Sequence, residues 1–338
     1  MSATTTTLTD ETVGADAAPA GSPPSAWDYD VAFQRHAGLI TSAEQAQLRG
    51  SRVAIAGMGG VGGSHLMTLA RLGIGAFHVA DPDEFDVANF NRQYGALVSN
   101  LGRNKAAAMA NAARDVNPEL DIRVFAEPIH AGNVDAFLEG ADLYVDGLDF
   151  FAIEARRVLF RRARERGLWA ITAGPIGLST AWLSFDPAGM SFDEYFDLHD
   201  GMDRVDQLVS FAVGLTPQAT HLKYTDLSGV DLASGAAPSA GLACMLASGV
   251  LAAECLKALV RPAALRPAPA FCQFDAYRGT LRQGRLRHGN RGWLQQLKRR
   301  LLSRRLSPVL AAARAPRSGD AAPPRSLGKL AAPASPTA

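Results

Sequence analysis

The sequence predicts an α/β fold: a Rossmann-like, doubly wound, mostly parallel sheet with an antiparallel extension and a crossover loop. Segments typical of strands and of helices alternate between residues 51 and 173. A glycine-rich turn, GMGGVG, follows the first strand, and the second strand ends in an acid, Asp81. Repeating strand–helix units form parallel sheets with helices on both faces, and ligands bind beyond the carboxyl ends of the strands.

The first half of the chain supplies five expected strands and the helices between them. The helix after the glycine turn, residues 63–72, places leucines on one side, and the last helix of this half is expected to be basic on its outer face. The expected strands are, in order, RVAIAG, AFHVAD, DIRVFAE, ADLYVDG and LWAITA. The expected helices after the first are NKAAAMANAARDVN, residues 134–138 and FAIEARRVLFRRARERG.

The second half of the chain has a different composition. STAWLSFDP is expected to be a strand, and AFCQFDAYRGTLRQGRLR a closing hairpin with its turn at Arg278–Gly279. Residues 188–238 between them are rich in Asp, Gly and Ser, which is typical of a loop that crosses the sheet or of a lid.

The longest apolar run, residues 239–260, is long enough to raise the question of a membrane span. Glu254 and Lys257 interrupt it, and charges in the middle of a bilayer are costly. A buried helix of a globular domain is therefore the favoured interpretation.

Residues 27–288 are expected to form one folded domain, whereas the two ends of the chain are expected to lie outside this unit. Residues 1–26 and 311–338 are poor in large apolar side chains and are expected to be a disordered arm and tail. Residues 289–310 are expected to form a basic amphipathic helix. From residue 276 to residue 319 there are twelve Lys or Arg and no acid. Such a helix can contact RNA, an anionic membrane or an acidic partner, or pack its leucines on the domain.

Composition narrows the functional classes. The formal net charge of +1 over 338 residues provides no global field for binding nucleic acid. Three cysteines without a CxxC pair fit a reducing cytoplasm. They cannot provide the four grouped ligands of a structural zinc site, so no zinc is expected.

The glycine turn is a candidate phosphate site. Glycines between a strand and a helix allow close approach of the backbone, and the helix N-terminus offers unpaired N–H donors. Asp81, at the end of the next strand, can accept hydrogen bonds from ribose hydroxyls. The pattern fits an NAD enzyme, an ATP enzyme or a turn without a ligand. The glycines are Gly57, Gly59, Gly60 and Gly62.

The residues after Asp81 favour ATP. A triphosphate is more anionic than a dinucleotide diphosphate, and attack at its α-phosphorus needs cations on the leaving pyrophosphate. Arg92 supplies a planar guanidinium group, and Lys105 supplies a compact ammonium charge. Both follow the same edge of the expected sheet. At the end of the fourth strand, Asp149 is the preferred Mg²⁺ ligand. Asp146 is the alternative ligand, or it pairs with backbone donors there.

Taken together, these motifs resemble the ThiF/MoeB/HesA family, the bacterial relatives of ubiquitin-activating enzymes. The resemblance rests on GMGGVG, Asp81, NFNRQ, GRNKA and DGLDF, with YDVAFQRHAGLI similar to the family's N-terminal arginine segment. It covers residues 29–186, and more loosely the helix at residues 239–260 with the closing hairpin.

The resemblance implies a homodimer or pseudo-dimer that uses ATP and Mg²⁺ to adenylate a carboxylate and releases pyrophosphate. It implies that Arg35 reaches the triphosphate of the neighbouring protomer, so that an isolated monomer is inactive. It assigns Gly57, Gly59 and Gly62 to the nucleotide, Asp81 to the ribose, Asn89, Arg92 and Lys105 to the phosphates with Gln93 beside them, and Asp149 to Mg²⁺.

The sequence departs from the family pattern in three places. The two CxxC pairs that form a zinc site in many members are missing. The usual nucleophilic cysteine is missing from residues 188–238, and Cys244 just beyond them fits an inert core thiol better than a reactive one. Phe150 follows the metal aspartate, where the family often has Asn.

The expected function is ATP-dependent adenylation of a carboxylate, without an enzyme thioester. The carboxylate is the C-terminus of a ubiquitin-like or sulfur-carrier protein, or belongs to a small molecule or modified nucleoside. Two alternatives stay open: a non-catalytic nucleotide-binding module and an NAD-dependent oxidoreductase. For the oxidoreductase, His130 after the third strand is the only candidate near a strand end, and it fits a capping role better.

Overall fold

The computed structural model describes residues 27–226 and 237–305. The expected arm (residues 1–26) and tail (residues 311–338) lie outside the described residues. So do residues 306–310 of the expected basic helix and residues 227–236, near the end of the expected crossover segment.

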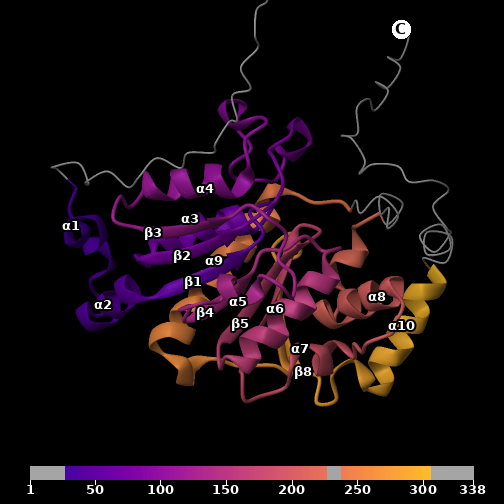
Figure 1. The fold of residues 1–338 in the computed structure, drawn as a ribbon. Coiled ribbons are helices and arrows are strands. Elements are labelled where there is room, and N and C mark those ends of the chain that lie inside the picture. Colours follow the sequence, from indigo (N-terminus) through magenta and orange to yellow (C-terminus); the bar gives the residue numbers. More distant parts are fainter. Residues whose placement is uncertain (1–26, 227–236, 306–338) are drawn as a thin grey trace, which may run out of the picture.

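One eight-stranded sheet forms the centre of the fold, in the order β3-β2-β1-β4-β5-β6-β7-β8 (Figure 1). The first five strands pair in parallel, and β6, β7 and β8 extend the sheet antiparallel. This confirms the predicted mostly parallel sheet with its antiparallel extension. The strands are β1 (Arg52–Ala56), β2 (Ala76–Ala80), β3 (Asp121–Phe125), β4 (Leu143–Asp146), β5 (Trp169–Ile176), β6 (Ser179–Phe185), β7 (Ala270–Asp275) and β8 (Thr280–Arg285).

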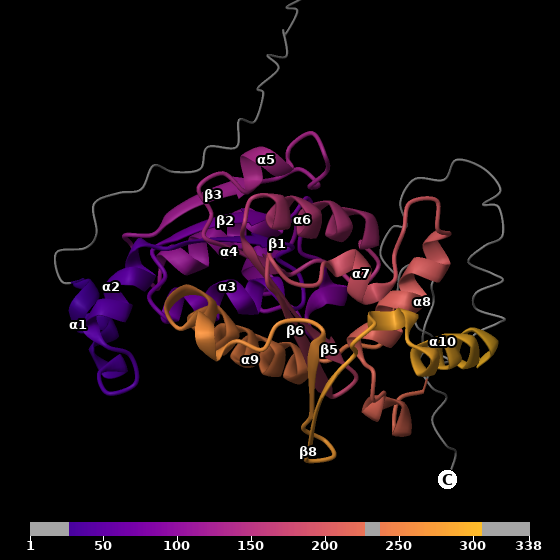
Figure 2. The ribbon, with the colours of Figure 1, turned by 90° about the horizontal axis from the view of Figure 1, so that it is seen from below.

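Helices cover both faces of this sheet, which explains why the central strands β2 and β4 are buried along their whole length. On one face α3, α4 and α9 enclose a core around Leu66, Met109 and Leu251. On the other face α5, α6, α7 and α8 enclose a core rich in phenylalanine (Figure 2). The helices are α1 (Tyr29–Phe33), α2 (Ser42–Gly50), α3 (Gly62–Arg71), α4 (Lys105–Arg114), α5 (Val134–Phe137), α6 (Ile153–Glu165), α7 (Phe192–Phe196), α8 (Arg204–Leu215), α9 (Gly241–Val260) and α10 (Trp293–Arg305).

The segment expected to be irregular contains two helices. Ser191 caps α7 through a capping box with Glu194, and Asp203 caps α8 by accepting from two backbone N–H groups. The aromatic side chains of α7, Phe192, Tyr195 and Phe196, are buried in the core. They therefore form a local core rather than an exposed apolar surface for a substrate.

Helix α6 does not present all of its basic residues to solvent. Arg156 and Arg157 are buried, and Arg157 pairs with Asp193 at 3.0 Å and with Asp200 at 2.9 Å. These two arginines are therefore not part of the expected basic outer face: Asp146 of β4 pairs with Arg156, and acids from the following segment fold over Arg157.

Helix α9 is the one described helix long and apolar enough to cross a membrane. Half of its apolar window is buried in this fold, where it packs on β5, β6 and α3. This agrees with the predicted core helix. The β7–β8 hairpin forms as expected, with Gly279 in the left-handed region at its turn.

Candidate functional site

The glycine turn between β1 and α3 is held closed by backbone contacts. Gly57 has a φ of +89°, and a Cβ on it would lie 2.3 Å from the carbonyl oxygen of Gly147 after β4. A Cβ on Gly62 would lie 1.7 Å from the carbonyl oxygen of Gly57. Both positions therefore need glycine for the fold itself, whether or not a ligand binds.

Gly59 and Gly60 differ, because no protein contact requires them to be glycine. A Cβ on Gly59 would lie 3.5 Å from Nε2 of Gln93, an ordinary contact. A Cβ on Gly60 would lie 3.4 Å from Sγ of Cys244 and 4.0 Å from Cγ of Arg92. The structure thus brings Cγ of Arg92 and the amide of Gln93 beside the glycine turn. Gln93 is buried and its Oε1 has no hydrogen-bond partner among the described residues.

Asp81 is buried at the end of β2 and braces the glycine turn. It accepts from the backbone N–H of Met58 at 2.7 Å and from that of Asp83 at 2.9 Å. Burial raises the pKa of Asp81, and these two N–H donors oppose the rise. A carboxylate has about four lone-pair sites, so two acceptor sites are left for ribose hydroxyls.

Lys105 is the first residue of α4. It is linked to Asp81 through Asp83, which both residues contact. Its Nζ pairs with Asp83 at 3.0 Å, and its backbone N–H donates to the carbonyl oxygen of Asp83 at 2.8 Å. Asn104 caps the helix and donates to the carbonyl oxygen of Asp81 at 2.9 Å. The lysine side chain is nearly buried while the acid beside it is mostly exposed, so phosphate can replace the acid as its partner.

Asn89 and Arg92 lie in the segment that rises between β2 and α4. The side chain of Asn89 accepts from the backbone N–H of Asp86, and Arg92 donates to the carbonyl oxygen of Ala88 at 2.9 Å. Asn91 donates to the carbonyl oxygen of Ser239 at 3.0 Å. This last bond fastens the segment to the residues just before α9, whose Cys244 lies beside Gly60 of the glycine turn.

The two acids at the carboxyl end of β4, Asp146 and Asp149, lie in different environments. Asp146 is buried and pairs with Arg156 at 2.8 Å, and it also accepts from Thr172 at 2.8 Å. It therefore has the structural role that the sequence left open. Asp149 is exposed and accepts from the backbone N–H of Phe151 at 2.9 Å. One such carboxylate, with water and phosphate as the other ligands, fits Mg²⁺.

Cys244 lies in the first turn of α9, against Gly60, and is fully buried. Burial raises the pKa of its thiol, which disfavours the nucleophilic thiolate. No three His, Cys, Asp or Glu side chains within the described ranges are grouped to hold a metal ion.

Arg35 is far from this site in its own chain. Arg35 lies in the short turn between α1 and α2. Tyr29 of α1 donates to the carbonyl oxygen of Gly73, and Gln45 of α2 donates to that of Leu72, at the end of α3. Helix α3 runs back from the glycine turn, so these contacts place Arg35 at the amino edge of the sheet. Figure 1 shows α1 and α2 at that edge, beyond the start of β1.

Three partners in this site were not singled out from the sequence: Asp83, Asn104 and Arg156. Asn104 carries a readable signal, since Asn before a helix is a typical N-cap. The pairs made by Asp83 and Arg156 depend on how neighbouring strand ends meet, which no local pattern encodes.

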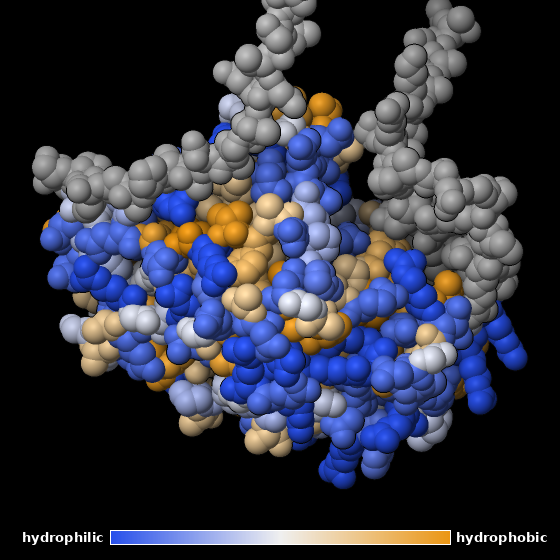
Figure 3. All heavy atoms as spheres, in the orientation of Figure 1, coloured by the Kyte–Doolittle hydropathy of each residue, from blue (hydrophilic) through white to orange (hydrophobic). Residues whose placement is uncertain are grey.

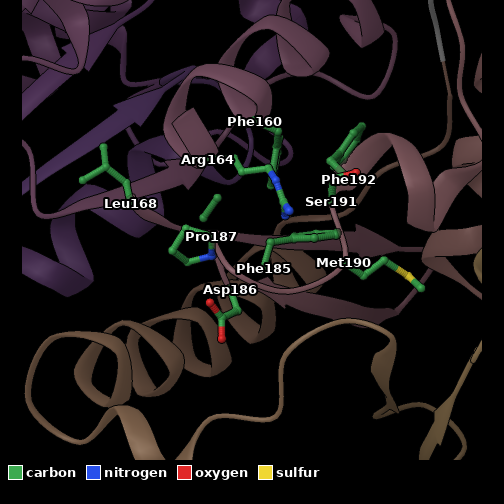
Figure 4. Close-up of a pocket in the computed structure, with 10 residues that line it drawn as sticks. Phe160, Arg164, Leu168, Phe185, Asp186, Pro187, Met190, Ser191 and Phe192 are labelled. Carbon is green, nitrogen blue, oxygen red and sulfur yellow. The ribbon is translucent and has the colours of Figure 1, made fainter. Parts of the chain in front are cut away.

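A small cavity lies elsewhere, between α6, α7 and β6 (Figure 4). It holds about 10 Å³, room for about one water molecule. Its lining includes Phe160, Phe185 and Met190, with Arg164 and Asp186 at its edge. It is too small for a substrate and is separate from the glycine turn.

Comparison with known proteins agrees with this geometry. The ThiF family model matches residues 33–292. The tRNA threonylcarbamoyladenosine dehydratase of Haemophilus influenzae is 29% identical over 154 residues, which are 45% of this chain and 58% of that protein. The probable adenylyltransferase/sulfurtransferase MoeZ of Mycobacterium tuberculosis is 32% identical over 108 residues, 32% of this chain and 28% of MoeZ. The chain thus matches less than two thirds of either relative's length.

Solved structures support the fold. Escherichia coli tRNA N6-threonylcarbamoyladenosine dehydratase, TcdA, has a TM-score of 0.52 at 22% identity, over 70% of this chain and 96% of that one. Escherichia coli MccB, solved with ATP, has a TM-score of 0.51 at 16% identity, over 73% of this chain and 65% of MccB. Because the family model covers most of the chain, including every motif of the glycine-turn site, the chain belongs to the ThiF family.

Proposed function

We propose that this protein uses ATP to adenylate a substrate carboxylate and releases pyrophosphate. One set of observations carries the proposal: Arg92 and Gln93 lie beside the glycine turn, Asp81 bonds to it, and the charge of Lys105 acts on Asp81. Two cations beside a phosphate-binding turn suit a triphosphate whose leaving group needs charge neutralisation. The ATP in the MccB structure and the adenylyltransferase name of MoeZ support the proposal.

The reaction needs no general base, because a carboxylate is ionised near pH 7. A carboxylate oxygen attacks the α-phosphorus, and the bond from phosphorus to the bridging oxygen breaks, leaving its electron pair on pyrophosphate. Arg92 and Lys105 offset the charge that develops on this leaving group. Lys105 exchanges its present partner, Asp83, for a phosphate oxygen.

Asp149 is the residue that would hold Mg²⁺. The ion, when bound, supplies further positive charge to the phosphate oxygens. Asp146 is unsuited to this role, because its ion pair with Arg156 is buried and removing either partner leaves an unpaired charge.

We propose that the acyl adenylate passes to its acceptor without an enzyme thioester, because the nearest thiol, Cys244, is buried against the glycine turn. The substrate is the C-terminus of a ubiquitin-like or sulfur-carrier protein, or a carboxylate on a small molecule or nucleoside. The names of the relatives support both classes, since one relative modifies a tRNA nucleoside and the other is a sulfurtransferase.

We propose that the protein acts as a homodimer in the cytoplasm. The segment before α4 and the outer side of α9 carry exposed apolar residues side by side, since Asn91 bonds to Ser239 and Gly241 between them. In Figure 3, apolar atoms reach the surface at the top of the molecule, where this segment rises above α4. This apolar rim consists of Val87, Phe90, Tyr94, Leu97, Val98, Leu101, Leu242 and Met245.

Such a rim is typical of a protein interface. Arg35 lies at the other edge of the sheet, so in a dimer it would serve the partner's site. Residues 27–288 would then be the adenylating unit, with residues 289–310 as an appended basic helix.

Exchange of labelled pyrophosphate into ATP, measured with candidate carboxylates, tests the activity. Lys105→Ala is expected to lower exchange at least about a hundredfold, on the scale of losing one transition-state contact. Lys257→Ala is the matched control, because Lys257 pairs with Glu254 near the far end of α9. Equal exchange by wild type and Lys105→Ala would contradict the role of Lys105.

Two other functions are distinguished by the same samples. Tight ATP binding without exchange against any carboxylate would indicate a non-catalytic nucleotide-binding module. A spectral change on titration with NADH would indicate an oxidoreductase. Arg92 beside the glycine turn and Lys105 near Asp81 disfavour both alternatives, because neither function needs neutralisation of a leaving pyrophosphate.

A further inference from the structure

Helix α10 turns its polar side toward the protein. Gln295 is buried and donates to the carbonyl oxygen of Val213 on α8, at 3.3 Å. Lys298 donates to the carbonyl oxygen of Pro217 at 2.6 Å, and Arg299 pairs with Asp197 at 2.7 Å. These bonds fix the helix on α8 with a defined rotation about its own axis.

The other side of α10 is apolar and exposed. Trp293 is 78% exposed, and Leu294, Leu297 and Leu301 are 45% to 53% exposed. These four residues recur at the spacing of one helix face. Arg300, Arg304 and Arg305 are exposed around them. We call these seven residues the outer face of α10.

The fold therefore reverses the usual arrangement of a surface helix, in which the apolar stripe faces the core. Leu302 is the one leucine of the described helix that packs on the domain core. Figure 2 shows α10 at the periphery, next to α8 and away from the sheet. An exposed stripe of one Trp and three Leu is typical of an interaction surface.

We propose that the outer face of α10 docks the protein on an anionic membrane surface. Between residues 276 and 305 the chain has ten Lys or Arg and no Asp or Glu. Lys298 and Arg299 bond to the domain, and the other cations complement anionic headgroups. Trp and Leu beside arginines are the composition of helices that lie in the interface plane. Arginine stems can extend along the apolar layer while their charged heads stay at the headgroups.

Other partners fit the outer face less well. RNA would be bound by the arginines and by stacking on Trp293, but it gives no use to three exposed leucines. A second copy of the helix would bring Arg300, Arg304 and Arg305 against the same residues, and like charges repel. This inference is independent of the adenylation chemistry, because the outer face shares no residue with the glycine-turn site.

The test uses the full chain and two vesicle preparations, phosphatidylcholine alone and phosphatidylcholine mixed with phosphatidylglycerol. Wild type is expected to sediment with the mixed vesicles and not with phosphatidylcholine alone. Leu297→Glu and Leu301→Glu are expected to weaken this binding at least about tenfold, since a carboxylate on the apolar stripe opposes both burial and attraction. Val31→Glu is the matched control, because Val31 is 62% exposed on α1, outside the basic segment.

A second readout follows Trp293, one of four tryptophans in the chain. Its emission, taken as the difference between wild type and Trp293→Phe, is expected to shift to shorter wavelength on mixed vesicles. Absence of binding to mixed vesicles, or equal binding by the Leu297→Glu and Leu301→Glu variants, would overturn the proposal. Tight binding of RNA, or self-association, that is lost in the same variants while vesicles stay unbound would overturn it in favour of that partner.

Discussion

The α-carbon of Gly62 lies so close to the carbonyl oxygen of Gly57 that a Cβ on Gly62 would be 1.7 Å from that oxygen. Gly62→Ala must therefore displace the turn and the start of α3. We expect it to lower the free energy of unfolding by at least about 3 kcal/mol, as severe overpacking does. Urea denaturation followed by circular dichroism measures this, and an unchanged midpoint would contradict the geometry.

Gly59 provides the matched comparison, because a Cβ there meets only Nε2 of Gln93 at an ordinary 3.5 Å. We expect Gly59→Ala to change stability by less than about 0.5 kcal/mol, as an open site allows. If phosphate lies against this part of the turn, the added methyl group should weaken ATP binding at least about tenfold. Calorimetric titration with ATP checks this, and wild-type affinity would remove Gly59 from the nucleotide site.

The two acids after β4 should respond oppositely to removal of their charge. Asp146→Asn breaks a buried ion pair with Arg156, and we expect a loss of about 3–5 kcal/mol of stability. Asp149→Asn removes an exposed charge, so stability should stay within about 0.5 kcal/mol while pyrophosphate exchange falls. Exchange measured over a range of Mg²⁺ concentrations, together with thermal unfolding, separates the two roles. Normal exchange by Asp149→Asn at low Mg²⁺ would exclude it as the ligand.

Local patterns in the sequence were sufficient to predict most of the sheet and the residues around its glycine turn. β1, β2 and β4 are short, mostly apolar runs that meet Gly57, Asp81 and Asp146 at their ends, and repeated strand–helix units predict a parallel arrangement. Arg92 and Lys105 could be assigned to the carboxyl edge of the sheet because both follow β2 in a segment that must start at that edge. Parallel strands bring such segments together without any further information.

The parts that could not be predicted depend on tertiary contacts. Helix α8 follows a stretch rich in Asp and Gly, and its apolar residues pack on α6 and α7, which the local composition does not reveal. Arg157 reads as a surface cation until Asp193 and Asp200 fold over it. For α10, periodicity predicts an amphipathic helix, but the hydrogen bond of Gln295 to α8 decides which side is buried.

Cys244 is expected to be dispensable for adenylation. Its thiol is buried, and this burial raises the pKa of the thiol. Cys244→Ala should lower the free energy of unfolding by about 1 kcal/mol, because truncating the buried side chain leaves a small void. Pyrophosphate exchange should stay within about twofold of wild type, because the thiol takes no part in the first step. Cys255→Ala, at a second buried cysteine of α9, controls for the packing defect. Normal exchange with loss of acyl transfer in Cys244→Ala alone would indicate a thioester.

His65 predicts how stability depends on pH. It is fully buried on α3 with Nδ1 at 2.8 Å from Oγ of Ser248 on α9, and burial lowers its pKa to about 3. In the unfolded chain, His65 binds a proton near pH 6.5, whereas the folded protein keeps it neutral down to about pH 3. The stability that neutral His65 provides is therefore complete above pH 6.5 and is lost as the pH falls toward 3. Between pH 7 and pH 5 this amounts to about 2 kcal/mol.

Urea denaturation at several pH values measures this slope, and His65→Gln should flatten it. His288→Gln, at an exposed histidine after β8, should leave the slope as in wild type. A wild-type slope in His65→Gln would mean that other buried groups, such as His221 with its pKa lowered by burial to about 4, govern the acid limb.

Arg35 is the residue whose proposed role requires a second protomer, because it lies at the amino edge of the sheet while Lys105 lies at the carboxyl edge. We expect Arg35→Ala and Lys105→Ala each to be nearly inactive in pyrophosphate exchange. After mixing and subunit exchange, half of the dimers carry one chain of each kind. Each of those has one intact site, so about a quarter of wild-type activity should return. Val98→Glu, on the apolar rim, should abolish this recovery by preventing association. No recovery from mixed dimers that sedimentation shows to have formed would mean that Arg35 does not act in its partner's site.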